Sequence, residues 1–195
     1  MLAAVVTQAA PGTVLVVLSQ VPPGFTREFA TALGRGHAHR RLRLFYQVET
    51  LVVGRAVERS LSPERHIVGC DDPQADLPAP YAAWLGAWGC PILRMRYESA
   101  ELAKISINLF LMSSVSVTNT LAELCEAIGA DWSEISPALT LDQRIGPHAY
   151  VKPGLGLAGG NLERDLATVR TLARAHGTDA GLVDAALSHS AYRRD

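Results

Sequence analysis

Apolar and polar residues alternate in short blocks over the first half of the chain. Residues 13–18 form an apolar, largely β-branched run that ends at the turn Ser19–Gly24, the pattern of a strand buried on both faces. Residues 25–34 follow with helical spacing and end at a glycine. Residues 43–46 and 65–69 fit two further short strands. The alternation of strand and helix signals predicts an α/β part with a parallel sheet.

A change of pattern follows residues 71–80, which hold three prolines and three aspartates and predict a surface connection. Residues 81–88 predict a helix and residues 91–94 a strand. From residue 98 to 128 the spacing is helical for about thirty residues, longer than most globular helices. Gly129 ends this run.

The remaining residues predict an all-helical second half. Asp131 has the position of a helix N-cap, and residues 143–160 form a loop rich in glycine and proline. Residues 161–176 and 180–190 again have helical spacing. The predicted fold is therefore an incomplete α/β part followed by an all-α domain with a long central helix.

The long helix is apolar on more than one side, and about a hundred residues cannot cover all of it. Either the helix bends within one fold, or it pairs with the same helix of a second subunit. We favour the pairing, since most oligomers are symmetric assemblies of identical chains.

Composition describes an ordinary globular protein. The 195 residues are 48% hydrophobic and 19% charged, with a net charge of −1, so no basic excess points to nucleic acid. The three cysteines form no CxxC pair, which argues against a metal site or disulfides and favours a reducing cytosol. The start of the chain lacks a signal peptide's positive region, and the apolar stretch 105–117 is shorter than a membrane span. We expect a soluble, cytoplasmic protein.

Candidate chemistry begins at Lys104 and Asn108, which share one helix face four residues apart in an apolar run. Polar groups there must be paired or point into a cleft. A cation beside a hydrogen-bond donor can hold an oxygen that gains negative charge. The alternative is a lysine that reaches solvent along its apolar stem, with Asn108 a satisfied buried amide.

Several sequence blocks occur together in a familiar order. They are Ser19–Thr26, Gly54–Glu58, Pro63–Gly69, Ser99–Leu111, Val115–Asn119, Leu124–Glu126, Gly129–Asp131, Asp142–Gly146, Pro153–Gly156, Gly159–Gly160 and Asp165–Leu166. Together they resemble UDP-glucose 6-dehydrogenase and its relatives in the UDP-glucose/GDP-mannose dehydrogenase family. The resemblance runs over nearly the whole chain.

The resemblance implies two domains. Residues 1–93 would be part of an NAD-binding, Rossmann-like domain, and residues 94–195 the central helical domain that dimerises and binds substrate. Members of the family use NAD to oxidise the C6 hydroxyl of a nucleotide sugar twice, in polysaccharide biosynthesis. The chain contains neither the opening βαβ unit with its GxGxxG nor the family's C-terminal domain. A homodimer through the 98–128 helix is expected.

The resemblance also assigns catalytic roles. Lys104 matches the lysine that holds the C6 oxygen, and Asn108 matches its neighbouring asparagine. Asp142 matches an aspartate that helps to organise water and the lysine, and Glu49 a glutamate near the sugar. Arg144 matches an arginine that reaches a bound nucleotide sugar, in the same or a partner subunit. A local ion pair between Asp142 and Arg144 is the plain alternative.

Further binding residues follow from the same resemblance. The predicted substrate-binding set is completed by Tyr150, Lys152, Gly156, Gly159, Gly160 and Asn161. Ser19 and Gln20 are the predicted cofactor-binding residues. The plain alternative for the glycines is a tight turn. Without the first glycine-rich turn, we expect the chain alone to bind NAD poorly.

One departure from the family changes the chemistry. Asn161 stands where the family has its nucleophilic cysteine. A carboxamide cannot attack an aldehyde as a thiolate does, so the site is expected to perform a single oxidation or none. Helix capping is the plain role for Asn161. The family's threonine that positions the hydrolytic water falls on Gln20.

Three functions therefore stay open. The chain is part of a UDP- or GDP-sugar dehydrogenase whose missing segments come from a longer gene product or a partner. Alternatively, it is a catalytically inactive remnant or regulatory subunit that pairs with a complete dehydrogenase. The third is a small-hydroxyacid dehydrogenase, which also uses a Lys-x-x-x-Asn pair; Asp142–Gly146 and the Gly-Gly loop count against it.

Overall fold

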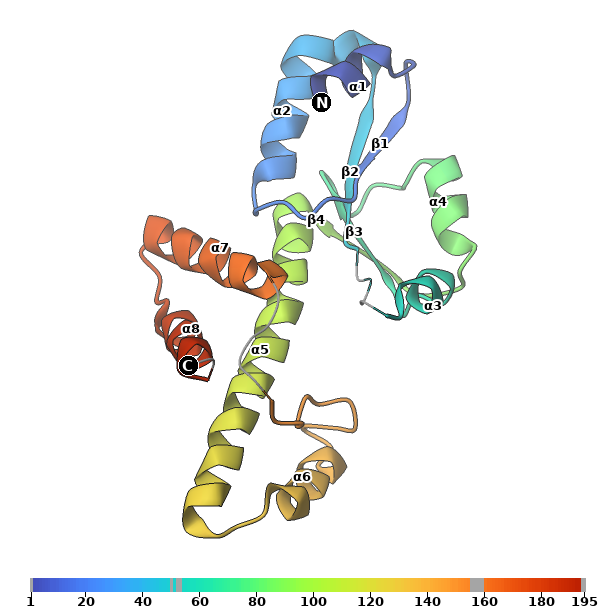
Figure 1. Ribbon diagram of the computed structural model, residues 1–195. Helices are drawn as coiled ribbons and strands as arrows, with labels where there is room; N and C mark the ends of the chain where they lie inside the picture. Colours follow the sequence, from blue (N-terminus) through green and yellow to red (C-terminus); the bar gives the residue numbers. More distant parts are fainter. Residues whose placement is uncertain (1, 50, 52–53, 155–159, 194–195) are drawn as a thin grey trace. The chain divides into compact units, whose positions relative to one another are not determined.

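The computed structural model describes residues 2–49, 51, 54–154 and 160–193. The chain divides into two compact units, residues 1–104 and residues 105–195. An α/β unit is followed by a helical one, as the sequence predicted (Figure 1).

Unit 1 contains a four-stranded sheet and short helices. Its elements are α1 (Leu2–Gln8), β1 (Val14–Val17), α2 (Phe25–His37), the 3-10 helix η1 (Ala38–Arg40), β2 (Arg43–Gln47), α3 (Ala56–Leu61), β3 (His66–Cys70), α4 (Ala79–Gly86), β4 (Ile92–Arg96) and the start of α5 (Tyr97–Ile128). The sequence did not predict α1 or α3. It also ended α2 at Gly34, but a glycine with open space around it lies within the helix at modest cost.

The sheet is mixed, and the prediction of a wholly parallel sheet was wrong. Its order is β1-β2-β3-β4, and β2 meets β3 antiparallel, with Tyr46 opposite Gly69 and Gln47 opposite Val68. The other two strand pairs are parallel. A run of buried β-branched residues has the same composition in either direction, so the pattern did not encode direction. Strand β1 is at the sheet edge and half-buried, not buried on both faces as predicted.

Each face of this sheet has its own apolar core. One core joins α1 and α2 to the strands, and its members are Val6, Leu15, Val17, Phe29, Ala30, Leu33, Leu42 and Leu44. The other packs under α4, and its members are Val14, Val16, Phe45, Val68, Cys70, Leu77, Tyr81, Leu85 and Ile92. Alternate residues of β1 enter opposite cores, as the two-residue period of a strand requires.

The first turns of α5 are fixed to unit 1 by close contacts. A Cβ added at Gly69 would lie 2.9 Å from Ala100 Cβ and 3.2 Å from the Tyr97 backbone, so the helix needs glycine in β3. The fully buried carboxylate of Glu101 accepts hydrogen bonds from the backbone N–H of Gly24 at 2.7 Å and of Thr26 at 2.8 Å. Glu101 therefore occupies the N-terminus of α2.

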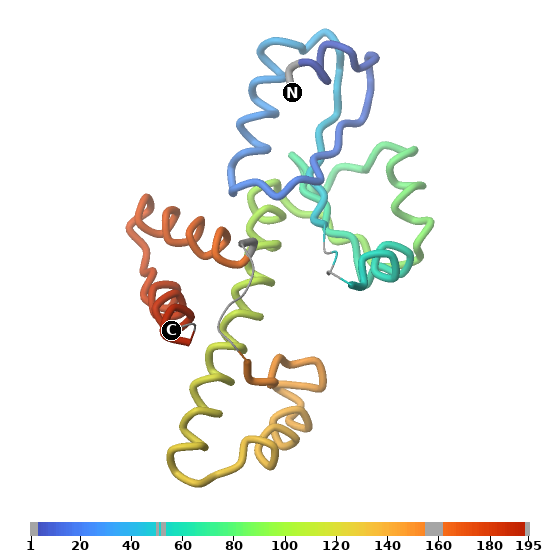
Figure 2. The backbone as a smooth tube through the Cα atoms, in the orientation of Figure 1, coloured from blue at the N-terminus to red at the C-terminus, as the bar shows by residue number. Residues whose placement is uncertain are grey.

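Unit 2 is helical, with α6 (Trp132–Leu141), α7 (Gly160–His176) and α8 (Gly181–Tyr192) placed along α5 (Figure 2). The 32-residue α5 confirms the predicted long helix. Gly129 ends it at a φ of 76°, and the Asp131 side chain caps α6 by accepting from Ser133 N at 2.7 Å. Both termini agree with the sequence prediction.

The core of unit 2 joins α5 to α7 and α8 through Met112, Leu166, Val183 and Ala186. Cys125 is also buried, as a core residue would be. By length and composition alone, α5 is long and apolar enough to cross a membrane, with a mean hydropathy of 1.3 over an 18-residue stretch of the helix. Only 28% of that stretch is buried in the structure.

Candidate functional site

The Lys104–Asn108 pair lies in α5 as the helical spacing predicted. Lys104 is half-buried and is the last residue of unit 1. In unit 2, the side-chain N–H of Asn108 donates a hydrogen bond to the carboxylate of Asp165 in α7. Asp165 is only 1% exposed, and the Arg164 guanidinium lies 3.8 Å from its other oxygen. The Asn108 amide is therefore held in one orientation by a buried carboxylate.

Asn161 lies at the end of α7 that approaches Asn108. Helix α7 begins at Gly160, so Asn161 is its second residue, one turn before Asp165. The Asn161 side chain is outside the described residues, as are Gly156 and Gly159. The backbone places position 161 about one turn from the Asn108–Asp165 contact.

Asp165 is the site residue that reasoning from the sequence missed. The block Asp165–Leu166 was part of the resemblance, yet no role was given to the carboxylate. A usable signal was present, because an aspartate four residues after Asn161 shares its helix face.

The segment before the glycine loop is fixed to helices by three side chains that the sequence did not single out. The Thr118 hydroxyl donates to Tyr150 O at 2.9 Å, and Trp132 Nε1 donates to Val151 O at 2.8 Å. The fully buried Asn119 accepts from the Gly154 N–H at 2.8 Å. These bonds determine where the chain enters the loop.

Tyr150 and Lys152, on that segment, are exposed. Asp142 and Arg144 form the local ion pair named above as the plain alternative. Arg144 Nη2 lies 2.6 Å from Asp142 Oδ2, and its backbone N–H donates to Asp142 Oδ1 at 2.9 Å. Hydrogen bonds from Arg144 hold the pKa of Asp142 below its usual value. A role for either residue toward substrate stays a prediction.

The predicted residues of unit 1 other than Lys104 follow the carboxyl ends of two neighbouring parallel strands. Ser19 and Gln20 follow β1, and Glu49 follows β2, which runs parallel to it. Ser19 and Glu49 are exposed and Gln20 is half-buried. The pKa of His66 lies below its usual value because the side chain is buried. The charge of the Glu49 carboxylate offsets part of that lowering.

The described part of unit 1 does not fit the pyrophosphate of a dinucleotide. Such a group rests on a glycine-rich turn and the open N-terminus of the helix that follows. Unit 1 has no GxGxxG, since the stretch with that spacing, Gly154–Gly159, belongs to unit 2, and two N–H groups at the N-terminus of α2, those of Gly24 and Thr26, already donate to the buried Glu101 carboxylate. A bound pyrophosphate would have to displace that carboxylate.

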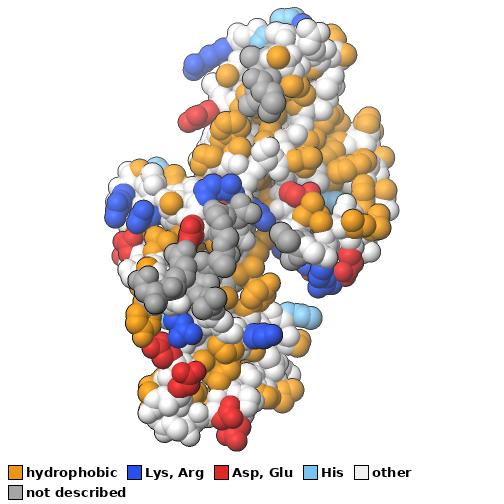
Figure 3. Space-filling model, in the orientation of Figure 1, with side chains coloured by type: hydrophobic (Ala, Val, Ile, Leu, Met, Phe, Trp, Pro, Cys, Tyr) orange, Lys and Arg blue, Asp and Glu red, His pale blue; other side chains and the backbone are white. Residues whose placement is uncertain are grey.

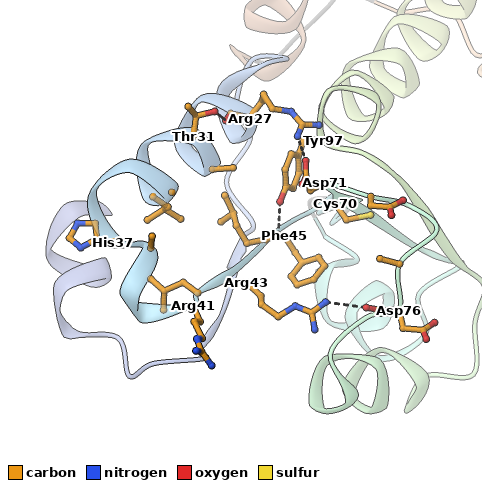
Figure 4. A pocket seen from close by; sticks show the side chains of 18 residues that line it. Arg27, Thr31, His37, Arg41, Arg43, Phe45, Cys70, Asp71, Asp76 and Tyr97 are labelled. Carbon is orange, nitrogen blue, oxygen red and sulfur yellow. Dashed lines mark hydrogen bonds and ion pairs between the residues drawn. The ribbon is translucent and has the colours of Figure 1, made fainter.

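A cavity of about 530 Å³ lies elsewhere in unit 1, between α2, the start of β2 and the residues after β3 (Figure 4). Its floor includes Leu44, Phe45 and Tyr97, and the Tyr97 hydroxyl donates to Leu44 O at 2.7 Å. Its charged rim includes Arg27, which forms ion pairs with Asp71 and Glu98. None of the predicted site residues in the described chain lines this cavity.

Comparison with known proteins identifies the helical unit. Residues 98–190 match the model of the UDP-glucose/GDP-mannose dehydrogenase family, central domain. Those residues belong to this family. The resemblance found from the sequence is thereby confirmed.

Individual relatives extend the similarity upstream. The chain is 33% identical over 144 residues to UDP-glucose 6-dehydrogenase AglM of Haloferax volcanii, covering 71% of this chain and 33% of the relative. It is 29% identical over 151 residues to UDP-glucose 6-dehydrogenase TuaD of Bacillus subtilis, covering 75% of this chain and 31% of the relative. The chain thus spans about a third of the length of these curated relatives.

Solved structures of nucleotide-sugar dehydrogenases are also similar to this chain. A UDP-glucose dehydrogenase from Pyrobaculum islandicum superposes with a TM-score of 0.81 at 30% identity, over 92% of this chain and 41% of the other. A UDP-D-ManNAc dehydrogenase from Pyrococcus horikoshii gives a TM-score of 0.80 at 22% identity, over 98% of this chain and 44% of the other, a likeness of fold.

Proposed function

We propose that this chain supplies the sugar-binding part of a nucleotide-sugar C6 dehydrogenase. The observation that carries the proposal is the Asn108–Asp165 hydrogen bond. It joins the α5 turn after Lys104 to the start of α7, where the family's nucleophile would lie. Family membership of residues 98–190 supports the same reading.

The proposed chemistry is stabilisation of an alkoxide at the sugar's C6 oxygen. An asparagine amide has two N–H donors, and Asp165 accepts from this one and orients it. The Lys104 ammonium, one helical turn earlier, would favour the negative charge that develops on oxygen. The sugar would belong to a UDP- or GDP-linked substrate, with Arg144, Tyr150 and Lys152 as further contacts.

The proposed reaction ends after one oxidation. With a carboxamide at position 161, no covalent thiohemiacetal forms, so the aldehyde would be released. NAD is the oxidant by family. Because unit 1 does not fit its pyrophosphate, the dinucleotide would be held by a segment from a longer gene product or from a partner. A cytoplasmic location accompanies this proposal.

A homodimer through α5 completes the proposal. Apolar side chains reach the surface of the molecule in Figure 3, and α5 carries several of the large ones. The second candidate function is a non-catalytic subunit that pairs with a complete dehydrogenase. The same exposed helix favours it.

Binding measurements test the function directly. UDP-glucose, UDP-N-acetylglucosamine and GDP-mannose are titrated into the purified chain by calorimetry. At least one should bind, and Lys104→Ala should weaken that binding at least tenfold, whereas Arg35→Ala, on the exposed side of α2, should not. Absence of binding by all three, in a chain that still forms dimers, would favour the non-catalytic subunit.

A further inference from the structure

The cavity of unit 1 has two charged walls of opposite sign. Three arginines line one wall, on α2, after η1 and on β2, and three aspartates that follow β3 line the other: Arg27, Arg41 and Arg43, and Asp71, Asp72 and Asp76. The positive charges of the arginines and the negative charges of the aspartates balance. A ligand of a single sign would therefore meet as much repulsion as attraction.

The two ends of this cavity differ in how far their charges are paired. At one end, the Arg27 guanidinium forms ion pairs with Asp71 and, at 2.9 Å, with Glu98. At the other end, Arg43 Nη2 donates at 3.1 Å to the backbone carbonyl of Asp76 (Figure 4). Within the described chain, no ion pair occupies the Arg43 guanidinium or the Asp76 carboxylate. This end therefore offers a guanidinium and, on the residue that it contacts, a carboxylate.

An apolar floor lies between the two walls. Leu33, Leu44, Phe45 and Tyr97 line it and are at most 8% exposed. The guanidinium carbon of Arg43 lies 6.0 Å from the centre of the Phe45 ring, a contact that helps to orient the cation. The Tyr97 hydroxyl already donates to Leu44 O, so the floor offers apolar surface to a ligand.

The backbone at Arg41 supports a built rim. Its φ is 49°, and no other non-glycine residue of the described chain has a positive φ. Side chains seldom adopt this conformation, and residues held in it cluster at ligand sites. Arg41 lines the cavity two residues before Arg43 and adds positive charge to the same wall.

We propose that this cavity binds a free amino acid with an apolar side chain. The ligand's carboxylate would accept from the unoccupied N–H groups of Arg43, and its ammonium would donate to the Asp76 carboxylate. Its side chain would lie on the floor beside Phe45. An amino acid carries its two charges on neighbouring groups, so each charge can meet an opposite one at this end of the cavity.

The size of the cavity suits such a ligand. Its volume of about 530 Å³ is within the range of roughly 300–1,000 Å³ that is typical of small-molecule sites. A nucleotide sugar is anionic and has no cation for Asp76. Because the cavity shares no residue with the proposed sugar site, this inference goes beyond the proposed function.

Defined probes test the ligand class by calorimetry and by shifts of the protein's amide NMR signals. L-leucine and L-phenylalanine should bind with dissociation constants below about 1 mM. Glycine has both charges but no apolar side chain, and should bind at least about tenfold more weakly than either. The same loss is expected for 3-phenylpropionate, which lacks the ammonium, and for 2-phenylethylamine, which lacks the carboxylate.

Substitutions test the two charged contacts. Arg43→Met should weaken phenylalanine binding at least about tenfold, because the carboxylate loses its charged donor. Asp76→Asn should remove most of the preference for phenylalanine over 3-phenylpropionate. Arg94→Met is the matched control, because Arg94 also donates to a backbone carbonyl of the segment after β3, Ala75 O at 2.8 Å, but does not line the cavity. It should leave binding within about twofold of wild type. Circular dichroism checks that each variant is folded.

Three results would overturn the proposal. They are the absence of saturable binding by either amino acid up to about 10 mM, equal affinity for phenylalanine and 3-phenylpropionate, and an equal loss of binding in Arg94→Met. Titrations of nucleotide sugars into the same variants report on the proposed function separately.

Discussion

Asn108→Asp is the sharpest test of the contact between α5 and α7. The substitution keeps the side chain's size but replaces an N–H donor with a second carboxylate. That carboxylate would face Asp165, which is 1% exposed. Two negative charges at hydrogen-bonding distance cannot both stay ionised in a buried site without a large cost.

The expected loss of unfolding free energy follows from the hydrogen bond that Asn108→Asp removes and the charge repulsion that it introduces. A hydrogen bond to a charged group contributes about 1.5–3 kcal/mol. Like charges about 4 Å apart repel by about 4 kcal/mol at an effective dielectric constant of 20. The Arg164 guanidinium at 3.8 Å offsets part of this repulsion, and uptake of a proton limits the rest. We expect unit 2 to lose about 3 kcal/mol of unfolding free energy at pH 7.

The pH dependence separates repulsion from general damage. In the variant, the carboxylate pair holds one proton to a higher pH than either group does in the unfolded chain. The loss should therefore be small near pH 4, where the unfolded chain is also largely protonated, and should grow as pH rises. Urea unfolding followed by the fluorescence of Trp132, the tryptophan of unit 2, measures it.

Reversing the pair is the control. Adding Asp165→Asn to Asn108→Asp restores one amide and one carboxylate, and should recover most of the lost free energy. A loss at pH 7 below about 0.5 kcal/mol, within the range of ordinary surface substitutions, would refute the contact. So would a double variant no more stable than Asn108→Asp alone.

Three further predictions concern unit 1, whose tryptophans Trp84 and Trp88 report its unfolding. Glu101→Ala should cost about 3 kcal/mol, because the N–H groups of Gly24 and Thr26 at the N-terminus of α2 lose a charged acceptor; an unchanged urea midpoint would contradict this. Burial lowers the pKa of His66, so unit 1 should lose stability as pH falls below about 6.5, and His66→Val should remove that slope. Burial raises the pKa of Tyr97 to about 12, so stability should fall as pH rises from about 10 toward 12, and Tyr97→Phe should flatten the fall.

Periodicity predicted the helices of unit 2 well because each has a clear start or end. Asp131 and Gly129 mark termini that the backbone itself requires. The short α3 carries Val57 and Leu61, both 73% exposed, and so shows no amphipathic pattern against unit 1. The antiparallel β2–β3 pairing was missed because strand direction is decided by the connection between strands.

The residues of the candidate site also fall into those that a local sequence pattern predicts and those that only the tertiary fold brings together. Lys104 and Asn108 were found because helical spacing alone places them together. Asp165 joins them only through the packing of α7 on α5, which no local pattern encodes. Thr118 and Asn119 hold the segment before the glycine loop by bonds to backbone groups more than thirty residues away. Contacts of that kind depend on the tertiary fold.

The groups that the chain keeps and the group that it lacks serve different stages of the proposed chemistry. Lys104, Asn108 and Asp165 would act while an alcohol oxygen carries negative charge. A thiol at position 161 would act only after an aldehyde has formed. Under the proposal that position 161 matches the family's cysteine, a sugar held by the first set would undergo the first stage without the second.

Asn161→Cys tests this separation. The introduced thiol should add reversibly to a nucleotide-sugar 6-aldehyde, with the sulfur attacking the carbonyl carbon and a proton passing to the new hydroxyl. The aldehyde should therefore slow alkylation of that thiol by iodoacetamide at least fivefold, as mass spectrometry measures, while native Cys90 is alkylated at an unchanged rate. Equal protection of both thiols would show general aldehyde reactivity. No protection would place position 161 away from the sugar, and the residue at that position would then say nothing about how many oxidations occur.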